Sequence, residues 1–258
     1  MIAIKSEAEI EKMRAACRAA AEILDAVARA VQPGRTTAEL DEIAAEMIGK
    51  LGGKSPFLGY RGYPGHLCVS VNEEVVHGIP SQRRVQYGDI VSLDVGIILD
   101  GFVGDNATTV PVGVIEPRTQ ELLRVTERAL YAGIAAARAG NRVGDISHAV
   151  QTTVESQGFS VVREFVGHGV GRKMHEEPQI PNYGRAGDGP KLKPGMTLAI
   201  EPMINAGASD VMMLSDGWTV VAADGAPSAH FEHTVLVTEG DAEILTWLKK
   251  SPYESKAR

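Results

Sequence analysis

An internal repeat is the feature that most constrains how this chain can fold. An amphipathic helix is predicted over 9–31, Pro33-Gly34 ends it, and Thr36 or Thr37 begins a second helix that runs to Ile48. The same order returns in a helix over 119–138, a break at Ala139-Gly140 and a helix over 143–156. Aligning Gly34 with Gly140, an offset of 106, also aligns Leu40 with Ile146 and Ile48 with Val154.

Each pair of helices is followed by a His-Gly pair and then by an apolar segment that ends in an acid. The segment from Gly88 to Asp94 resembles the segment from Gly195 to Glu201 at an offset of 107. This period is too long for a solenoid, so we expect one domain over 1–258 with two related halves, roughly 9–112 and 115–240. Two unrelated helical stretches that coincide are the alternative. Related halves would bring Asp94 and Glu201 together at the centre, where buried like charges need a cation between them.

A β-hairpin is predicted from Ile90 to Val112, because Asp100-Gly101 separates two β-branched and aliphatic runs. If these two residues form the turn, the numbers of paired residues sum to 201, so Asp94 faces Ala107 and Asp105 faces Gly96. Asp94 and Asp105 are then diagonal neighbours on one face, roughly 7–8 Å apart at the backbone. A solvated surface would also accommodate two acids, but on an apolar hairpin we favour ligands for cations.

Composition excludes several classes of protein. The 258 residues are 44% hydrophobic, which is enough for a packed core, and the formal charge of 26 − 33 = −7 argues against a DNA-binding surface. The first residues are rich in charge and no apolar run has the roughly 20 residues of a membrane helix. Cys17 and Cys68 are expected to be reduced thiols. We therefore expect a cytoplasmic globular protein that does not bind membranes.

Three familiar motifs fail in this sequence. The glycines around His168 would need a further glycine at Arg172 to bind a dinucleotide, and Gly53-Lys54-Ser55 would need glycine at Ile48 to form a P-loop. His175-Glu176 has no second histidine at the spacing of a zincin helix. The glycines do allow close backbone approach around His168. What remains is a histidine and four carboxylates at the ends of apolar strands, an oxygen-rich set suited to two divalent ions: Asp94, Asp105, His168, Glu201 and Glu232.

Taken in order, the segments around these residues resemble the type I methionine aminopeptidases over about residues 4–246. The resemblance implies the pita-bread fold, a mixed α/β (α+β) fold with two pseudo-symmetric halves around a central, curved antiparallel sheet and helices on its outer face. The segments that carry the resemblance are Ser55–Tyr60, Ser70–Glu73, His77–Pro80, Gly88–Val91, Gly167–Gly171, His175–Pro178, Glu201–Met203 and Glu232–Thr234.

The resemblance also implies a role for each residue that matches the family's motifs. The five residues of the oxygen-rich set match its metal ligands, with Asp105 and Glu232 bridging two ions. His77 and His175 match its substrate-facing histidines, and the methionine pocket is expected at Tyr60, Tyr63, Cys68 and Trp218. This sequence departs from the family in having Met174 where an aromatic residue is common, and Gly65-His66 where Lys-Ser is more common.

The implied reaction is removal of the initiator methionine from nascent proteins, with a preference for a small second residue. A hydroxide that bridges the two ions would attack the first peptide bond. Glu201 would carry its proton to the leaving amine, His175 would donate to the oxyanion, and His77 would position the peptide beyond the cut. The two divalent ions could be Co, Mn, Fe, Zn or Ni, because such a ligand set accepts several metals.

Related functions remain as alternatives. Prolidases and aminopeptidases P share the five ligands but carry an extra domain before the catalytic one, whereas the first helix here is expected within ten residues of Met1. Type II methionine aminopeptidases carry a long insertion between the last two glutamate ligands, which here are only 232 − 201 = 31 positions apart. A non-catalytic binding module would have lost ligands. The expected partners are the N-termini of nascent polypeptides, with the chain a monomer and a transient contact with the ribosome left open.

Overall fold

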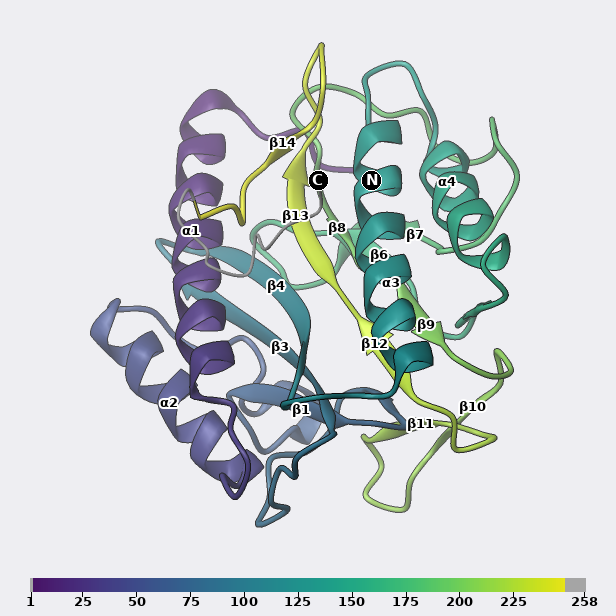
Figure 1. The fold of residues 1–258 in the computed structure, drawn as a ribbon. Coiled ribbons are helices and arrows are strands. Elements are labelled where there is room, and N and C mark those ends of the chain that lie inside the picture. Colours follow the sequence, from purple (N-terminus) through teal and green to yellow (C-terminus); the bar gives the residue numbers. More distant parts are fainter. Residues whose placement is uncertain (1, 249–258) are drawn as a thin grey trace.

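The structure is a computed structural model that describes residues 2–248 (Figure 1). Its helices are α1 (Glu7–Ala30), α2 (Thr37–Lys50), the 3-10 turn η1 (Tyr60–Gly62), α3 (Pro117–Ala136) and α4 (Val143–Glu155). Its strands are β1 (Leu67–Val71), β2 (Glu74–Val76), β3 (Ile90–Leu99), β4 (Phe102–Pro111), β5 (Ser160–Val161), β6 (Gly167–Gly169), β7 (Glu176–Ile180), β8 (Thr197–Ile200), β9 (Met203–Asn205), β10 (Val211–Met213), β11 (Val220–Ala222), β12 (Ser228–His230), β13 (Glu232–Leu236) and β14 (Glu243–Ile244).

The four long helices lie within about two residues of their predicted bounds, because local signals set their ends. Ser6 begins α1 and Thr36 begins α2, each in a capping box in which a glutamate three residues later accepts from the backbone N–H of the capping residue. Gly34 and Gly140, aligned by the repeat, both have positive φ, at 89° and 94°. Each glycine therefore takes a turn conformation that a side chain would disfavour.

The main sheet has the order β1-β3-β4-β13-β8-β6-β7, with β14 paired to β13, and every pairing in it is antiparallel. The predicted hairpin register is confirmed, since Asp94 pairs with Ala107 and Gly96 pairs with Asp105. Asp100 and Gly101 both take positive φ in the turn, as a two-residue hairpin loop of the favoured kind requires. At the centre, β13 joins β4 through two residue pairs, Glu232 with Ala107 and His233 with Asn106.

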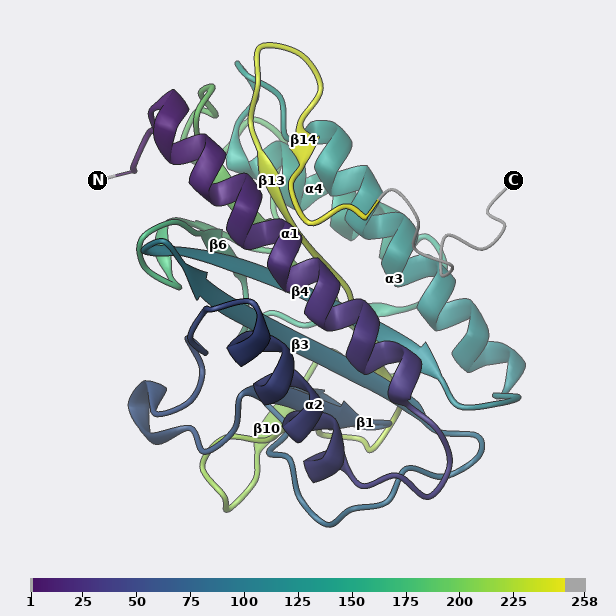
Figure 2. The same ribbon diagram turned by 90° about the vertical axis from the view of Figure 1, so that its left-hand side faces the viewer.

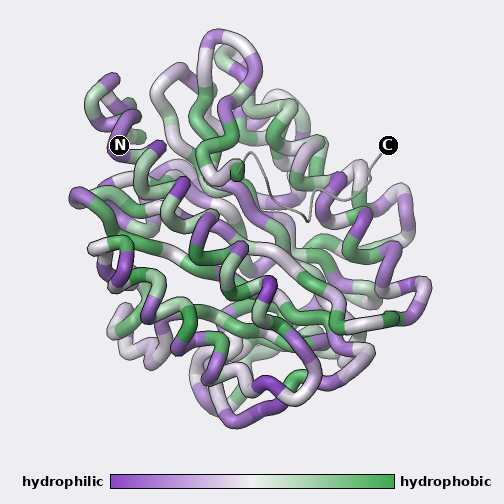
Figure 3. Tube along the Cα trace, turned by 60° about the vertical axis from the view of Figure 1, so that its left-hand side comes forward, coloured by the Kyte–Doolittle hydropathy of each residue, from purple (hydrophilic) through white to green (hydrophobic). Residues whose placement is uncertain are grey.

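The helices cover one face of this sheet, which we call the helix face. In Figure 1, α1 and α2 lie on one side of β13 and α3 and α4 on the other, and Figure 2 shows α1 crossing in front of the hairpin β3–β4. Hydrophilic and hydrophobic residues alternate along the helices (Figure 3), so each helix can bury one side. One core packs α1 and α2 on Val91, Leu93 and Val95, and another packs α3 and α4 on β8 and β13.

Helix α1 approaches β4 most closely at Gly104. A Cβ atom placed there would lie 2.2 Å from the carbonyl oxygen of Ala16 and 2.7 Å from the backbone nitrogen of Cys17. The helix can therefore cross the strand at this level only because Gly104 has no side chain. Cys17 and Cys68 are both buried free thiols, as expected.

Two small sheets, β10-β11-β2 and β12-β9-β5, lie beside the main sheet, and α3 and α4 contact the strands β12, β9 and β5. We call the face of the main sheet that is turned away from the helices the pocket face. Strand β12 also contacts β3 and β4, and β2 contacts both β9 and β12. Val76, Met203 and Trp218, contributed by these sheets and the loop before β11, line the pocket described below. Among residues 2–248, no helix has the length and apolarity needed to cross a membrane.

Candidate metal centre and active site

Three carboxylates meet on the pocket face where the strands β3, β4 and β13 lie side by side. Asp94 in β3 and Glu232 in β13 are the neighbours of Ala107 on its two sides, and Asp105 lies two residues before Ala107 in β4. Residues two apart on a strand share a face, so all three side chains point the same way. One oxygen of each carboxylate lies within 4.8 Å of one oxygen of the other two, close enough to share a metal ion.

His168 and Glu201 complete this cluster from the neighbouring strands. His168 lies in β6, Glu201 follows the last residue of β8, and the His168 Nε2 atom lies 3.4 Å from Glu201 Oε1 and 3.6 Å from Asp105 Oδ2. The other ring nitrogen, Nδ1, lies 2.9 Å from the carbonyl oxygen of Gly169. A carbonyl can only accept, so Nδ1 carries the proton and Nε2 is left as a lone-pair donor that faces the acids.

The predicted close approach of backbone around His168 is confirmed. A Cβ on Gly167 would lie 2.4 Å from the carbonyl oxygen of Ala199, and one on Gly169 would lie 2.3 Å from that of Glu177. Both flanking positions are therefore restricted to glycine by the strands on either side. This packing fixes the height of the His168 ring above the sheet.

Burial raises the pKa of every carboxyl group in the cluster. The pKa values of Asp94 and Glu201 rise to about 7, with the charge of Glu201 adding to the effect of burial on Asp94. The pKa values of Asp105 and Glu232 rise well above the usual range, again mainly through burial and then through the charges of the neighbouring acids. Four acids so close together cannot all ionise unless positive charge is placed among them.

The unsatisfied oxygens of the cluster fit a divalent metal centre. Asp94 Oδ1, Asp105 Oδ1 and Glu232 Oε1 are buried and have no hydrogen-bond partner among the described residues. Buried polar atoms are normally paired, so three unpaired oxygens from one carboxylate cluster fit a site that binds a cation. The donors are carboxylate oxygens with one imidazole, which hard and borderline divalent ions prefer, and no cysteine is among them.

The acids lie at the base of a pocket of about 610 Å³ that also holds the predicted substrate residues. Its lining includes all eleven residues predicted from the sequence: Tyr60, Tyr63, Cys68, His77, Asp94, Asp105, His168, His175, Glu201, Trp218 and Glu232. The structure thus brings together residues drawn from both halves of the chain. A pocket of this size suits one side chain and the adjoining peptide bond.

Two further histidines face the acids across this pocket. The ring of His175 lies 4.5 Å from that of His168, and its Nδ1 atom lies 3.1 Å from the Tyr60 hydroxyl. The ring of His77 makes edge contacts with Phe165 and Trp218. Burial lowers the pKa of His77 to about 4, with His230 adding to the effect, and burial followed by the charges of His77 and Arg61 lowers that of His175. Both rings are therefore neutral near pH 7.

An apolar recess adjoins the acids. Phe57, Tyr63 and Cys68 form a small buried cluster, and Met174 and Trp218 pack against it. The Tyr63 ring meets the edge of Trp218 with 5.0 Å between ring centres, and its hydroxyl donates to the carbonyl oxygens of Leu67 and Gly78. The recess thus presents aromatic faces and a thiol, while the Tyr63 hydroxyl is already satisfied by the two carbonyl oxygens.

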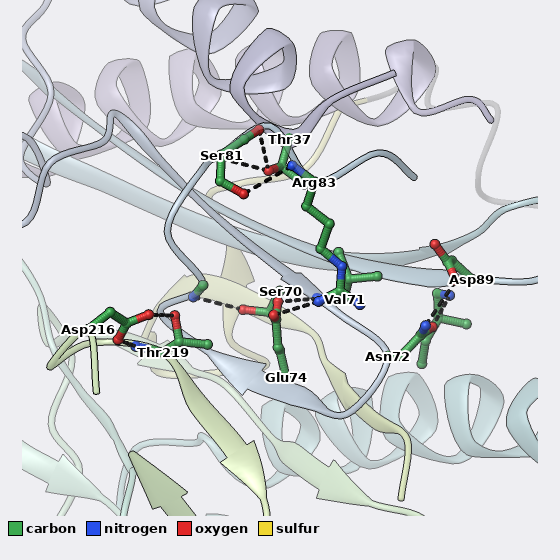
Figure 4. Close-up of polar contacts among 12 residues, drawn as sticks. Thr37, Ser70, Val71, Asn72, Glu74, Ser81, Arg83, Asp89, Asp216 and Thr219 are labelled. Atoms are coloured by element: carbon green, nitrogen blue, oxygen red, sulfur yellow. Dashed lines mark hydrogen bonds and ion pairs between the residues drawn. The ribbon is translucent and has the colours of Figure 1, made fainter. Parts of the chain in front are cut away.

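Hydrogen bonds shown in Figure 4 hold the two segments that carry His77 and Trp218. Glu74 accepts from the backbone N–H of Val71 and from Arg83, and the hydroxyl of Ser70 accepts from the N–H of Gly78. Asp216 accepts from the backbone N–H groups of Trp218 and Thr219 and from the Thr219 hydroxyl. His77 itself has φ 61°, a conformation that only firm anchoring on both sides would maintain.

The pocket lining also contains residues that the sequence did not predict, among them Phe57, Phe165 and His230. His230 is the most informative omission, since it is 2% exposed and its Nε2 atom lies 3.5 Å from Glu201 Oε2. The sequence does contain a pattern that could have identified His230. His230 and Glu232 are separated by one apolar residue, so in an extended segment they fall on the same face.

The two departures from the family pattern lie in different places. Met174 lines the pocket beside the apolar recess, so it bears on the shape of the site. His66 lies away from the pocket lining and binds Asp41 of α2, which accepts from the backbone N–H groups of His66 and Leu67. The Gly65-His66 departure therefore concerns the anchoring of β1 to α2.

Comparisons with known proteins agree with this geometry. The model of metallopeptidase family M24 matches residues 11–239. Methionine aminopeptidase 1 of Bacillus subtilis is 52% identical over 246 residues, which are 95% of this chain and 99% of the relative. The crystal structure of a methionine aminopeptidase from Thermotoga maritima matches with a TM-score of 0.94 and 51% identity, covering 96% of this chain and all of that one.

A more distant structure shares only the fold. The prolidase from Pyrococcus furiosus matches with a TM-score of 0.79 and 24% identity, covering 96% of this chain but 66% of the prolidase. The predicted mixed α/β class, with a curved antiparallel sheet and outer helices, is confirmed by both structures.

Proposed function

This chain belongs to metallopeptidase family M24, and we propose that it is a methionine aminopeptidase that removes the initiator methionine from new polypeptides. Its fold is the pita-bread fold of that family's structures. The observation that carries the proposal is the pocket in which the cluster of Asp94, Asp105 and Glu232 adjoins an apolar recess. A peptide that places a long apolar side chain in the recess would present its first peptide bond to the acids.

The residues proposed to hold two divalent ions are Asp94, Asp105, His168, Glu201 and Glu232. Bound ions would polarise the scissile carbonyl and lower the pKa of the attacking water. Glu201 accepts the proton of that water and passes it to the leaving amine. Its position between two imidazoles, beside the other acids of the site, suits a group that must both take and release a proton.

His175 and His77 complete the reaction on the substrate side. His175 faces His168 across the pocket, so its ring can donate to the oxygen of the peptide bond as negative charge develops there. Tyr60 contacts Nδ1 of His175, which leaves Nε2 for that oxygen. The His77 ring, set between Phe165 and Trp218, limits the space beyond the scissile bond and positions the peptide.

Specificity for methionine follows from the recess formed by Phe57, Tyr63, Cys68 and Trp218 together with Tyr60 at its rim. An unbranched thioether fits irregular space and makes favourable contacts with aromatic rings. The crowding around His77 favours a small residue in the second position. Met174 lies beside the recess and contributes a flexible wall in place of an aromatic ring.

The remaining expectations also belong to this proposal. We propose a single catalytic domain over 1–258 with the two repeats of roughly 9–112 and 115–240, acting as a monomer in the cytoplasm on the N-termini of nascent chains. A transient contact with the ribosome would bring it to these substrates. The metal is one of Co, Mn, Fe, Zn or Ni, and the ligand set accepts each of them.

The test is peptide hydrolysis by protein that has been stripped with chelator and reloaded with single metals. We expect no activity without metal and release of methionine from Met-Ala-Ser once Mn²⁺, Co²⁺ or Fe²⁺ is added. Peptides that begin with Leu, and peptides with Pro second, serve as comparisons. Preference for an Xaa-Pro bond would favour the prolidase alternative, and full activity in metal-free protein would contradict the two-metal site.

A further inference from the structure

His230 is a buried imidazole of the pocket that the proposed reaction does not use. It ends β12, is 2% exposed, and its Nε2 atom has no hydrogen-bond partner among the described residues. A buried ring nitrogen without a hydrogen-bond partner costs free energy, so we expect Nε2 to have such a partner in the active enzyme.

The backbone of His230 is tied to the hairpin that carries the two aspartates. Its N–H donates to the Thr109 hydroxyl oxygen at 2.9 Å, and that hydroxyl donates to the His230 carbonyl at 2.8 Å. The Ser92 hydroxyl lies 2.8 Å from that of Thr109 and therefore donates to it. Since Ser92 and Thr109 are directly paired across β3 and β4, these bonds fix the His230 ring relative to Asp94 and Asp105.

The ring is directed at the carboxylate of Glu201. His230 Nε2 lies 3.5 Å from Oε2, while His168 Nε2 lies 3.4 Å from Oε1. Two imidazoles thus bracket one carboxylate, each beside a different oxygen. His168 Nε2 is bare, because Nδ1 donates to Gly169, so it offers Glu201 no proton. His230 is then the ring that can donate one.

We propose that His230 is a positioning residue for Glu201, with its Nε2–H donating to Oε2 so that Oε1 remains turned toward His168 and the metal site. This role rests on the proposed function, since it gives Glu201 a fixed orientation for proton transfer. A small rotation of the carboxylate closes the 3.5 Å contact to a hydrogen bond. His77 and Asp94 also lie near enough to interact electrostatically with the His230 ring, and Glu201 Oε2 lies 3.5 Å from its Nε2 atom.

Substitution separates this role from direct substrate or metal binding. At saturating Mn²⁺, His230→Leu should lower kcat on Met-Ala-Ser by roughly 10- to 100-fold with little change in KM, the usual effect of losing a group that orients a ligand. His230→Gln keeps an N–H donor and should recover most of the loss. Calorimetric titration with Mn²⁺ should find the same number of ions in both variants.

His233→Gln is the matched control. His233 lies three residues further on, in β13, and its Nδ1 atom contacts the Thr246 hydroxyl at 2.8 Å. It lines a separate hollow on the helix face, so its replacement should leave kcat at the wild-type level. A rise in KM alone for His230→Leu would make His230 a substrate contact, and loss of an ion would make it a ligand; either result overturns the proposal, as does an unchanged kcat.

The tautomer of the wild-type protein gives a test that does not depend on the activity of any variant. In Zn²⁺-loaded protein with ¹⁵N-labelled histidine, NMR should show the neutral His230 ring protonated on Nε2 and the His168 ring protonated on Nδ1. Absence of the signal in His230→Gln would assign it. A His230 ring protonated only on Nδ1 would overturn the inference. Wild-type protein that fails to cleave Met-Ala-Ser would instead contradict the proposed function.

Discussion

Gly104→Ala should lower the free energy of unfolding, because the new side chain would clash where α1 crosses β4. The new Cβ would lie 2.2 Å from the carbonyl oxygen of Ala16, about 1.2 Å short of the 3.4 Å at which ordinary contact begins. The three nearest atoms are all backbone atoms of Ala16 and Cys17, so no side chain can swing away. The helix must therefore move off the strand, or the strand must bend.

The cost follows from this geometry. Overpacking of a closed core costs about 1–3 kcal/mol, occasionally more, and a clash between two backbones belongs at the upper end. For a protein of this size, a loss of about 3 kcal/mol lowers the melting temperature by roughly 6–12 °C. Because Asp105 follows Gly104 directly, we also expect weaker metal binding.

The assay is urea and thermal denaturation of metal-free protein, followed by calorimetric titration with Mn²⁺. Gly49→Ala in α2 is the matched control, since a Cβ there has no atom within 4 Å and φ is not positive. Alanine should stabilise that helix by up to about 1 kcal/mol. A Gly104→Ala protein as stable as the wild type would show that α1 does not press on β4 as described.

Three further predictions concern the site and the helix face. His168→Ala should weaken Mn²⁺ binding in calorimetry, because it removes a proposed metal ligand. His175→Ala should keep the ions and lower turnover by a factor on the order of 10²–10³, as removal of one oxyanion donor does. The opposite pattern would show that the two histidines have the opposite roles. Met-Gly peptides should be cleaved far faster than Met-Lys peptides, and equal rates would remove the proposed crowding at His77. Burial raises the pKa of Glu127 in α3, so the folded protein binds its proton more tightly than the unfolded chain and loses stability as pH rises above the ordinary value of 4.5. Glu127→Gln should therefore raise the melting temperature at pH 7 and not at pH 4, and a gain equal at both pH values would contradict this cause.

Local chemistry explains what the sequence could predict. Asp100-Gly101 determines the turn, and the turn determines every pair of the hairpin, so Asp94 and Asp105 could be placed on one face before the structure was known. The helix ends follow from Ser6, Thr36 and the glycines after each helix. The roles assigned to the site residues remain predictions for the experiments above.

Long-range pairing explains what the sequence could not predict. His230 reaches Glu201 because β12 pairs with β9, and because its backbone bonds to Thr109, which is 230 − 109 = 121 positions away in the sequence. Phe165 follows β5 and His77 follows β2, so they meet only after β2 has packed on β9, the partner of β5. Periodicity reports which face a residue takes but not which strand will lie opposite it.

The join between β4 and β13 has a consequence for how the protein matures. Asp94 and Glu232 are 232 − 94 = 138 positions apart and meet only when these two strands pair. Closing so long a loop is slow compared with forming a local hairpin, and a chain still being synthesised cannot close it until its last strands have left the ribosome. Metal capture must therefore be one of the final events of folding. An unfinished copy without β13 would lack both Glu232 and the strand that joins β4 to β8, and so would have no complete metal site and no peptidase activity while it is itself a nascent chain.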